Sequence, residues 1–119
     1  MKIAITSNGN TLNDKVDPRF GRCKYLLIVD TESLQFEAVD NIDNINRAGG
    51  AGIQAAEILS TNGVEVLLTG HCGPNAFTTL KAAGIKIFTD VEGNIAEVVE
   101  RFNRNDLKAT DAPDVVGHW

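Results

Sequence analysis

The sequence contains no long apolar run. None of its 119 residues belongs to a stretch that approaches the roughly 20 consecutive apolar residues of a membrane-spanning helix. The segment after Met1, Lys2-Ile3-Ala4-Ile5-Thr6, has the length of a strand and lacks both the apolar length and the cleavage site of a signal peptide. We therefore expect a cytoplasmic protein without a membrane partner.

Positive charge and cysteine are also scarce. Lys and Arg number 11 against 16 Asp and Glu, and the net charge of −5 argues against a nucleic-acid partner, because such binding relies on basic residues that neutralise phosphates. Only Cys23 and Cys72 carry thiols, and their separation in a cytosolic chain predicts free thiols instead of a disulfide. Two Cys and two His without close spacing also argue against structural zinc.

What the sequence does contain is the pattern of one small α/β domain over residues 1–103. Apolar or alternating runs predict five strands, at 2–6, 23–29, 34–39, 64–69 and 85–88. Helical periodicity predicts three helices, which follow the glycines at 49–52, Pro74 and Asn94 and end near 62–63, at Gly84 and near Phe102. Asn94 followed by Glu97 resembles a capping box. Periodicity fails after Asn103, so residues 104–119, which end in His118-Trp119, are expected to form a flexible tail.

The order βββαβαβα favours a mixed five-stranded sheet with strand order 3-2-1-4-5 and an antiparallel strand two. Strands one, three, four and five then point the same way, so the loops at 7–22, 40–52, 70–75 and 89–93 share one end of the sheet. Strand two begins at that end, which brings Cys23 there. Ligands in open α/β sheets collect where the strand order reverses, here between strands one and four. Cys23 and Cys72 are therefore expected to border one crevice.

The turn between the fourth strand and its helix carries the strongest candidate chemistry. His71 and Cys72 lie between Gly70 and Gly73, at the positive end of a helix that begins with Pro74. Unpaired N–H groups at such an end favour anions and lower the pKa of a thiol. Cys72 is thus a candidate ligand or nucleophile, and a small buried side chain is the alternative. His71 is either a second ligand or simply an exposed residue.

Two enzyme classes fit the sequence poorly. A cysteine hydrolase needs a His base close to Cys72, and neither the adjacent His71 nor His118 in the tail suits that role. A two-metal nuclease needs clustered carboxylates, and the first strand, Ile3-Ala4-Ile5, carries none.

Two further motifs border the expected crevice. Gly50-Ala51-Gly52 partly matches a dinucleotide fingerprint, but it does not leave a strand directly and no acidic residue follows at the required spacing. A closely packed helix start is the simpler interpretation, and its N–H groups can still receive an anion. Arg19 and Arg22 flank Phe20-Gly21. They either meet an anionic ligand, or Asp17 and Arg19 pin the loop while Phe20 fills the core.

Together these motifs resemble the dinitrogenase iron-molybdenum cofactor biosynthesis family, with this chain as a small stand-alone member. The resemblance extends to about residue 103 and is carried by Met1-Lys2-Ile3-Ala4-Ile5, Arg19-Phe20-Gly21-Arg22, Gly50-Ala51-Gly52-Ile53-Gln54-Ala55-Ala56, Gly70-His71-Cys72-Gly73-Pro74-Asn75-Ala76-Phe77 and Ala82-Ala83-Gly84-Ile85-Lys86. It implies a ribonuclease H-like three-layer α/β/α domain that binds or carries an iron-sulfur precursor or the finished cofactor. Where some relatives have His directly before Gly-Ala-Gly, this chain has Gly49.

We therefore expect a non-enzymatic protein that binds or carries an iron-sulfur or iron-molybdenum cluster, or its precursor, between donor and acceptor proteins. Thiolate ligands suit such clusters. The expected metal ligands are Cys72, with Cys23 and His71 as partners, and the expected contacts to the anionic cluster are Arg19, Arg22, Gly50, Gly52, Gly73 and Asn75. Two alternatives stay open. One is a regulatory or interaction module that holds a small anion or nucleotide at the glycine-rich helix starts, and the other is a thiol enzyme or redox sensor.

Overall fold

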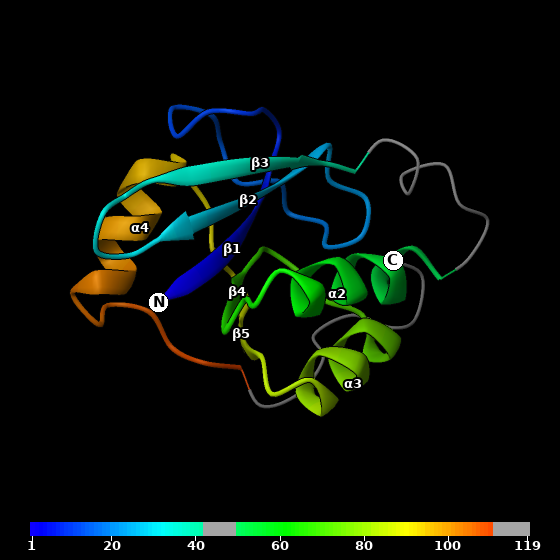
Figure 1. Ribbon diagram of the computed structural model, residues 1–119. Coiled ribbons are helices and arrows are strands. Elements are labelled where there is room, and N and C mark those ends of the chain that lie inside the picture. Colours follow the sequence, from blue (N-terminus) through cyan, green and yellow to red (C-terminus); the bar gives the residue numbers. More distant parts are fainter. Residues whose placement is uncertain (42–49, 111–119) are drawn as a thin grey trace.

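The computed structural model describes residues 1–41 and 50–110 of the chain. Each of the predicted strands and helices is present (Figure 1). Their bounds are β1 Lys2–Ser7, β2 Tyr25–Asp30, β3 Phe36–Asp40, α2 Ala51–Thr61, β4 Val66–Leu68, α3 Pro74–Ala82, β5 Lys86–Phe88 and α4 Ile95–Asn103. None of the helices in the described ranges is long and apolar enough to cross a membrane.

The sheet has the predicted strand order β3-β2-β1-β4-β5. Strand β2 runs antiparallel to β1 and β3, whereas β4 is parallel to β1 and β5 is parallel to β4. The strand order therefore reverses between β1 and β4, where Ala4 lies opposite Leu67. The predicted βββαβαβα topology is confirmed, and its switch point is the place where open α/β sheets usually bind ligands.

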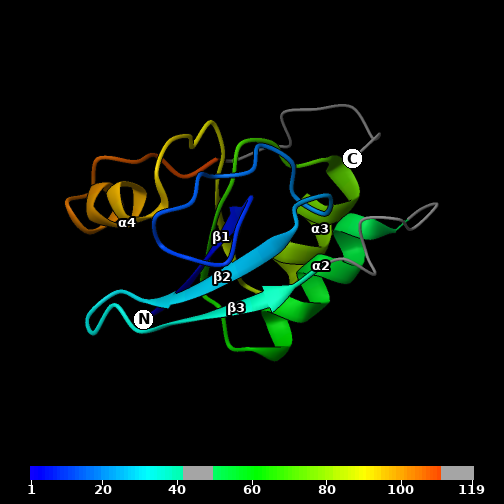
Figure 2. The ribbon, with the colours of Figure 1, turned by 90° about the horizontal axis from the view of Figure 1, so that it is seen from above.

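Helices cover both faces of the sheet and give three layers (Figure 2). Helices α2 and α3 pack together on one face, and α4 lies on the other. Because strand side chains alternate between the faces, Ala4 points toward α2 and α3 while Ile3 and Ile5 point toward α4. Each face has its own hydrophobic core, so the predicted ribonuclease H-like three-layer arrangement is confirmed.

Several strand boundaries differ from the prediction, β4 among them at Val66–Leu68 instead of 64–69, and two of these differences have a clear local reason. Strand β2 begins at Tyr25 instead of Cys23, because the carbonyl groups of Gly21 and Cys23 are bound by the side-chain amide of Asn41, at 3.3 and 2.9 Å. Strand β3 begins at Phe36 instead of Leu34, because Leu34 has a φ of 61°. A left-handed residue ends a strand, since extended backbone needs a negative φ.

After α4 the chain returns to the edge of the sheet. Thr110 donates its backbone N–H to the carbonyl oxygen of Ile87 at 2.7 Å, and its hydroxyl lies 2.7 Å from that of Thr89. The part of the expected tail up to Thr110 is thus bonded to β5 and the residue after it. The rest of that tail, with His118-Trp119, lies outside the described residues, as does Gly49.

Candidate functional site

The loop before β2 and the turn after β4 lie side by side at the carboxyl ends of β1 and β4. His71 donates its N–H to the carbonyl oxygen of Pro18 at 2.7 Å, and Phe20 donates its N–H to the carbonyl oxygen of His71 at 3.2 Å. Gly70 permits this approach, because a Cβ at that position would lie 2.6 Å from the Cα of Pro18. The loop that carries Arg19 and Arg22, which we call the arginine loop, and the His71-Cys72 turn are therefore direct neighbours.

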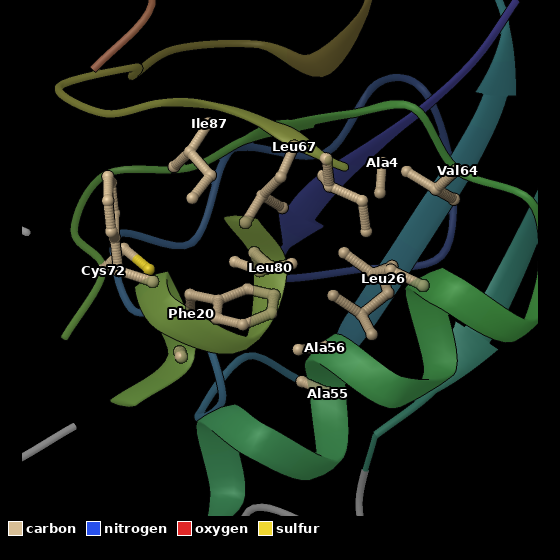
Figure 3. Packing of buried hydrophobic residues seen from close by; sticks show 14 of the residues in the cluster. Ala4, Phe20, Leu26, Ala55, Ala56, Val64, Leu67, Cys72, Leu80 and Ile87 are labelled. Atoms are coloured by element: carbon tan, nitrogen blue, oxygen red, sulfur yellow. The ribbon is translucent and has the colours of Figure 1, made fainter. Parts of the chain in front are cut away.

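The same loop also packs against the start of α2. Gly21 has a φ of 95°, and a Cβ on it would lie 2.9 Å from the backbone nitrogen of Gly52. Phe20 is almost fully buried in the core beneath α2 and α3 (Figure 3). Arg19 and Arg22 flank Phe20 and Gly21. They thus belong to a loop that packs between the His71-Cys72 turn and the glycines at the start of α2.

Asp17 lies buried below the loop and fixes the backbone of Arg19. Its Oδ1 accepts the N–H of Arg19 at 2.9 Å and lies 3.9 Å from the Arg19 Nε. The carbonyl oxygen of Asp17 accepts the Thr6 hydroxyl at 2.6 Å, which lies 2.9 Å from the Thr69 hydroxyl. The Arg19 side chain stays half exposed. The interpretation in which Asp17 holds the loop at Arg19 was one of the two offered by the sequence. The contact between the Thr6 and Thr69 hydroxyls was not predicted, although a threonine at the carboxyl end of each central strand could have indicated it.

The first turns of α2 and α3 enclose a small cavity of about 70 Å³. Its lining includes four of the six residues predicted to contact an anion, Gly50, Gly52, Gly73 and Asn75, together with Ile53, Pro74 and Ala76, whereas Arg19 and Arg22 are not part of it. Both helices have a glycine N-cap, which forms no side-chain hydrogen bond, whereas Asn94 caps α4. The cavity therefore lies at the positive ends of two helix dipoles.

Both thiols are free and fully buried in the core on the α2 and α3 side of the sheet. Figure 3 shows Cys72 at the margin of this core, beside Phe20. Burial, together with the charge of Asp17, raises the pKa of the Cys23 thiol to about 12, although backbone N–H groups of Ser7 and Gly21 oppose the shift. Cys23 is therefore a neutral thiol at physiological pH, and neither sulfur is reached from solvent in this conformation.

His71 and Cys72 leave their turn in different directions. Cys72 enters the core, whereas the half-buried His71 lines a hollow of about 280 Å³ with Pro18, Asp90 and Glu92. Within residues 1–41 and 50–110, no group of three or more His, Cys, Asp or Glu side chains could hold a metal ion. The expected ligands Cys72, Cys23 and His71 thus share one end of the molecule without forming such a group.

Comparison with known proteins gives consistent matches over nearly the whole chain. A family model for the dinitrogenase iron-molybdenum cofactor matches residues 1–105. An uncharacterised protein from Methanocaldococcus jannaschii is 30% identical over 110 residues, which are 91% of this chain and 90% of that protein.

Solved structures extend this similarity to the fold. The apo form of the orange protein from Desulfovibrio gigas has a TM-score of 0.93 and 42% identity, with 96% of both chains covered. A NifB-like protein from Thermotoga has a TM-score of 0.80 and 37% identity, with 96% of this chain and 98% of that chain covered. The chain therefore belongs to the dinitrogenase iron-molybdenum cofactor family.

Proposed function

We propose that this protein is a non-enzymatic, cytoplasmic carrier of an iron-sulfur or iron-molybdenum cluster, or of a precursor. Family membership supports the class of cargo. Donor and acceptor proteins for the cluster are the partners that a carrier requires. A carrier must also release its cargo, which favours a site that holds the cluster without many metal–protein bonds.

The cargo is held as an anion at the rim formed by the starts of α2 and α3 and the arginine loop. The observation that carries this proposal is the cavity between two helix starts whose N-cap residues are both glycines. Arg19 and Arg22 add positive charge from the loop that packs against Gly52. Metal–sulfide clusters are commonly anions, and helix N-termini together with guanidinium groups are the donors that bind anions in proteins.

Direct coordination by Cys72, with Cys23 or His71, is the second binding mode. It requires the arginine loop or the turn at 70–73 to open, because both thiols are fully buried. It also requires Cys23 to lose a proton whose pKa burial has raised to about 12, and bonding to a metal would have to supply that free energy. The closed conformation therefore favours the anionic mode.

A regulatory or interaction module that binds a small anion or nucleotide is the alternative function. The glycine-rich helix starts support it as well, because backbone N–H groups receive phosphate and metal–sulfide anions alike. The carrier and the module differ in their ligand. They can be distinguished by whether the protein retains a metal–sulfide cluster or binds a nucleotide.

Anaerobic reconstitution with iron and sulfide, with and without molybdate, tests the proposal. We expect charge-transfer absorption that stays with the protein through gel filtration. It should weaken strongly in an Arg19→Ala/Arg22→Ala variant, since the guanidinium groups are removed. Arg104→Ala is the matched control, because Arg104 pairs with Asp106 at 3.0 Å beyond the end of α4 and lies outside the rim.

The Cys72→Ser variant distinguishes the two binding modes. Absorption that persists in this variant supports the anionic mode, and absorption that disappears supports coordination by the thiol. A wild-type protein that retains no metal under any of these conditions, but melts at a higher temperature with a nucleotide, would replace the carrier with the module.

A further inference from the structure

Exposed apolar side chains gather at the end of the molecule opposite the cargo rim. Among the described residues, the large hydrophobic side chains with high exposure include Met1 and Leu34, each 50% exposed, and Phe36 at 42%. The carbonyl oxygen of Met1 accepts the N–H of Thr31 at 3.0 Å, which joins the N-terminus to the β2–β3 turn. Figure 1 shows both at the left of the molecule, whereas α2 begins at the right.

Leu34 occupies a backbone conformation that suits glycine or asparagine. Its φ is 61°, and its N–H is donated to the carbonyl oxygen of Asp30 at 2.9 Å, which closes the turn. A side chain with a Cβ pays a steric cost in the left-handed region. Local folding therefore gives no reason for a leucine here, and its half-exposed side chain adds apolar surface that water disfavours.

An apolar hollow of about 120 Å³ adjoins Leu34 between the sheet and α4. Its lining is mostly aliphatic and includes Leu12, Val29, Leu34, Ala96 and Val99, with Glu100 and Asn103 beside them. The volume is close to the roughly 150 Å³ of an apolar protein cavity that accepts benzene. The hollow thus has room for one large apolar side chain.

Carboxylates surround this apolar surface. Glu100 lines the hollow, and Asp30 and Glu32 belong to the turn that carries Leu34. Within the described part of the chain these three carboxylates form no salt bridge. Backbone N–H groups of Ser33 and Glu32 hold the pKa of Asp30 below its usual value, so it stays ionised. Lys2, opposite Asp30 in the sheet, and the N-terminal ammonium, whose charge also lowers the pKa of Asp30, neutralise only part of this charge.

The charge identifies the kind of occupant. A second copy would bring the same carboxylates against each other, which opposes a symmetric contact. The chain's own residues 111–119 carry Asp111 and Asp114 and no Lys or Arg, and they follow Thr110 beside β5. A segment of another protein with an apolar side chain between basic residues satisfies both the hollow and the carboxylates.

We propose that Leu34 and the adjoining hollow form a docking site for a partner protein that inserts a large apolar residue flanked by Lys or Arg. The site goes beyond cargo binding and does not depend on it. Because it lies away from the starts of α2 and α3, a partner can dock while the cargo rim stays open.

The test uses a short amphipathic peptide of leucine and lysine, and its leucine–glutamate counterpart, titrated into the ¹⁵N-labelled protein. The lysine peptide should shift the amide signals of Leu34, Ala96 and Val99, and the glutamate peptide should not. Leu34→Gly should weaken the binding of the lysine peptide by about fivefold or more, as expected for loss of an apolar anchor. The melting temperature of the Leu34→Gly protein should equal or exceed that of the wild type, since glycine removes the steric cost of a Cβ in the left-handed conformation.

Ile53→Ser is the matched control, because it removes another exposed apolar side chain at the opposite end of the molecule and should leave peptide binding unchanged. The proposal is wrong if Leu34→Gly binds the lysine peptide as tightly as the wild type, or if the shifts appear at the cargo rim. It is also wrong if the protein is a dimer that Leu34→Gly dissociates, since a second copy then covers the surface.

Discussion

Burial raises the pKa of the Cys23 thiol from about 9 to about 12, and the charge of Asp17 adds to the effect. A thiol is charged only after it loses its proton, so the folded protein keeps a proton that the unfolded chain loses near pH 9. The stability that this difference contributes is complete below about pH 9 and is lost as the pH rises toward 12.

We therefore expect the free energy of unfolding to fall more steeply with pH in the wild type than in Cys23→Ala between about pH 9 and 12. The limiting difference in slope is ~1.4 kcal/mol per pH unit for one thiol. Urea unfolding at a series of pH values measures both slopes, and the Lys and Tyr titrations common to both proteins cancel. Parallel curves would contradict the proposed burial of Cys23.

Alanine variants of Gly21 and Gly84 distinguish the cost of a steric contact from the cost of backbone strain. Both have a positive φ, 95° and 77°, but a Cβ on Gly84 would meet nothing within 4 Å, whereas one on Gly21 would lie 2.9 Å from the Gly52 nitrogen. We expect Gly84→Ala to cost ~1 kcal/mol of unfolding free energy and Gly21→Ala ~2 to 3 kcal/mol, because the contact adds to the strain.

Cargo binding should separate these two glycine variants further. Gly21→Ala displaces the start of α2 from the arginine loop and should weaken retention of the reconstituted cluster, while Gly84→Ala should leave it unchanged. Urea unfolding and the cluster absorption measure the two effects. Equal losses of stability in both variants would remove the steric argument.

The residues at the helix starts could be predicted from the sequence more easily than the burial of a given side chain. The glycines at 50, 52 and 73 line the cavity because helix starts are local features, set by neighbouring residues. The burial of Cys72 depends on Phe20, a residue distant in the sequence that enters the same core from another loop. No local pattern around Cys72 carries that information.

At the scale of elements, the three helices of the described residues differ in how they begin. Asn94 accepts the N–H groups of Ala96 and Glu97 at 2.9 and 3.4 Å, and the carbonyl oxygens of Leu12 and Asp14 accept those of Ala96 and Ile95. The N–H groups at the start of α4 are thereby satisfied, whereas the N-cap residues of α2 and α3 are glycines, which have no side chain to accept a hydrogen bond. The cavity at the proposed cargo rim therefore lies beside helix starts whose N-cap residue supplies no side-chain cap.

Asn94→Ala should lower the free energy of unfolding by ~1 kcal/mol, because the helix loses its side-chain cap. It should leave cluster retention unchanged, since α4 covers the opposite face of the sheet from α2 and α3. Urea unfolding and the cluster absorption measure these effects. A loss of cluster in Asn94→Ala, at unchanged stability, would mean that α4 takes part in the site.

Elements and their order were predictable because hydrophobic period and turn residues are local. Two of the boundaries that differ from the prediction depend on particular hydrogen bonds. Leu34 reads as a strand residue by its hydrophobicity, but the turn closed by its N–H and the Asp30 carbonyl places it at a positive φ. Cys23 continues an apolar run, yet the Asn41 amide holds its carbonyl group outside the ladder.

At the scale of the whole molecule, the net charge of −5 opposes the approach of the anionic cargo that we propose for the rim. The two effects act over different distances. The rim lies close to the cargo, while many carboxylates are spread over a molecule of 35 × 28 × 24 Å. The Debye length is about 30 Å at 0.01 M salt, about 10 Å at 0.1 M and about 3 Å at 1 M. Distant repulsion is therefore screened at lower salt than local attraction.

We expect the association rate of a synthetic iron-sulfur cluster with small thiolate ligands, which is an anion, to pass through a maximum with salt. The rate should rise between about 0.01 and 0.1 M as distant carboxylates are screened, and fall toward about 1 M as Arg19 and Arg22 are screened as well. Stopped-flow absorbance measures the rate. The Arg19→Ala/Arg22→Ala variant should keep the rise and lose most of the fall. A rate that only decreases from the lowest salt would mean that the rim alone governs approach and that the acidic remainder of the chain does not oppose it.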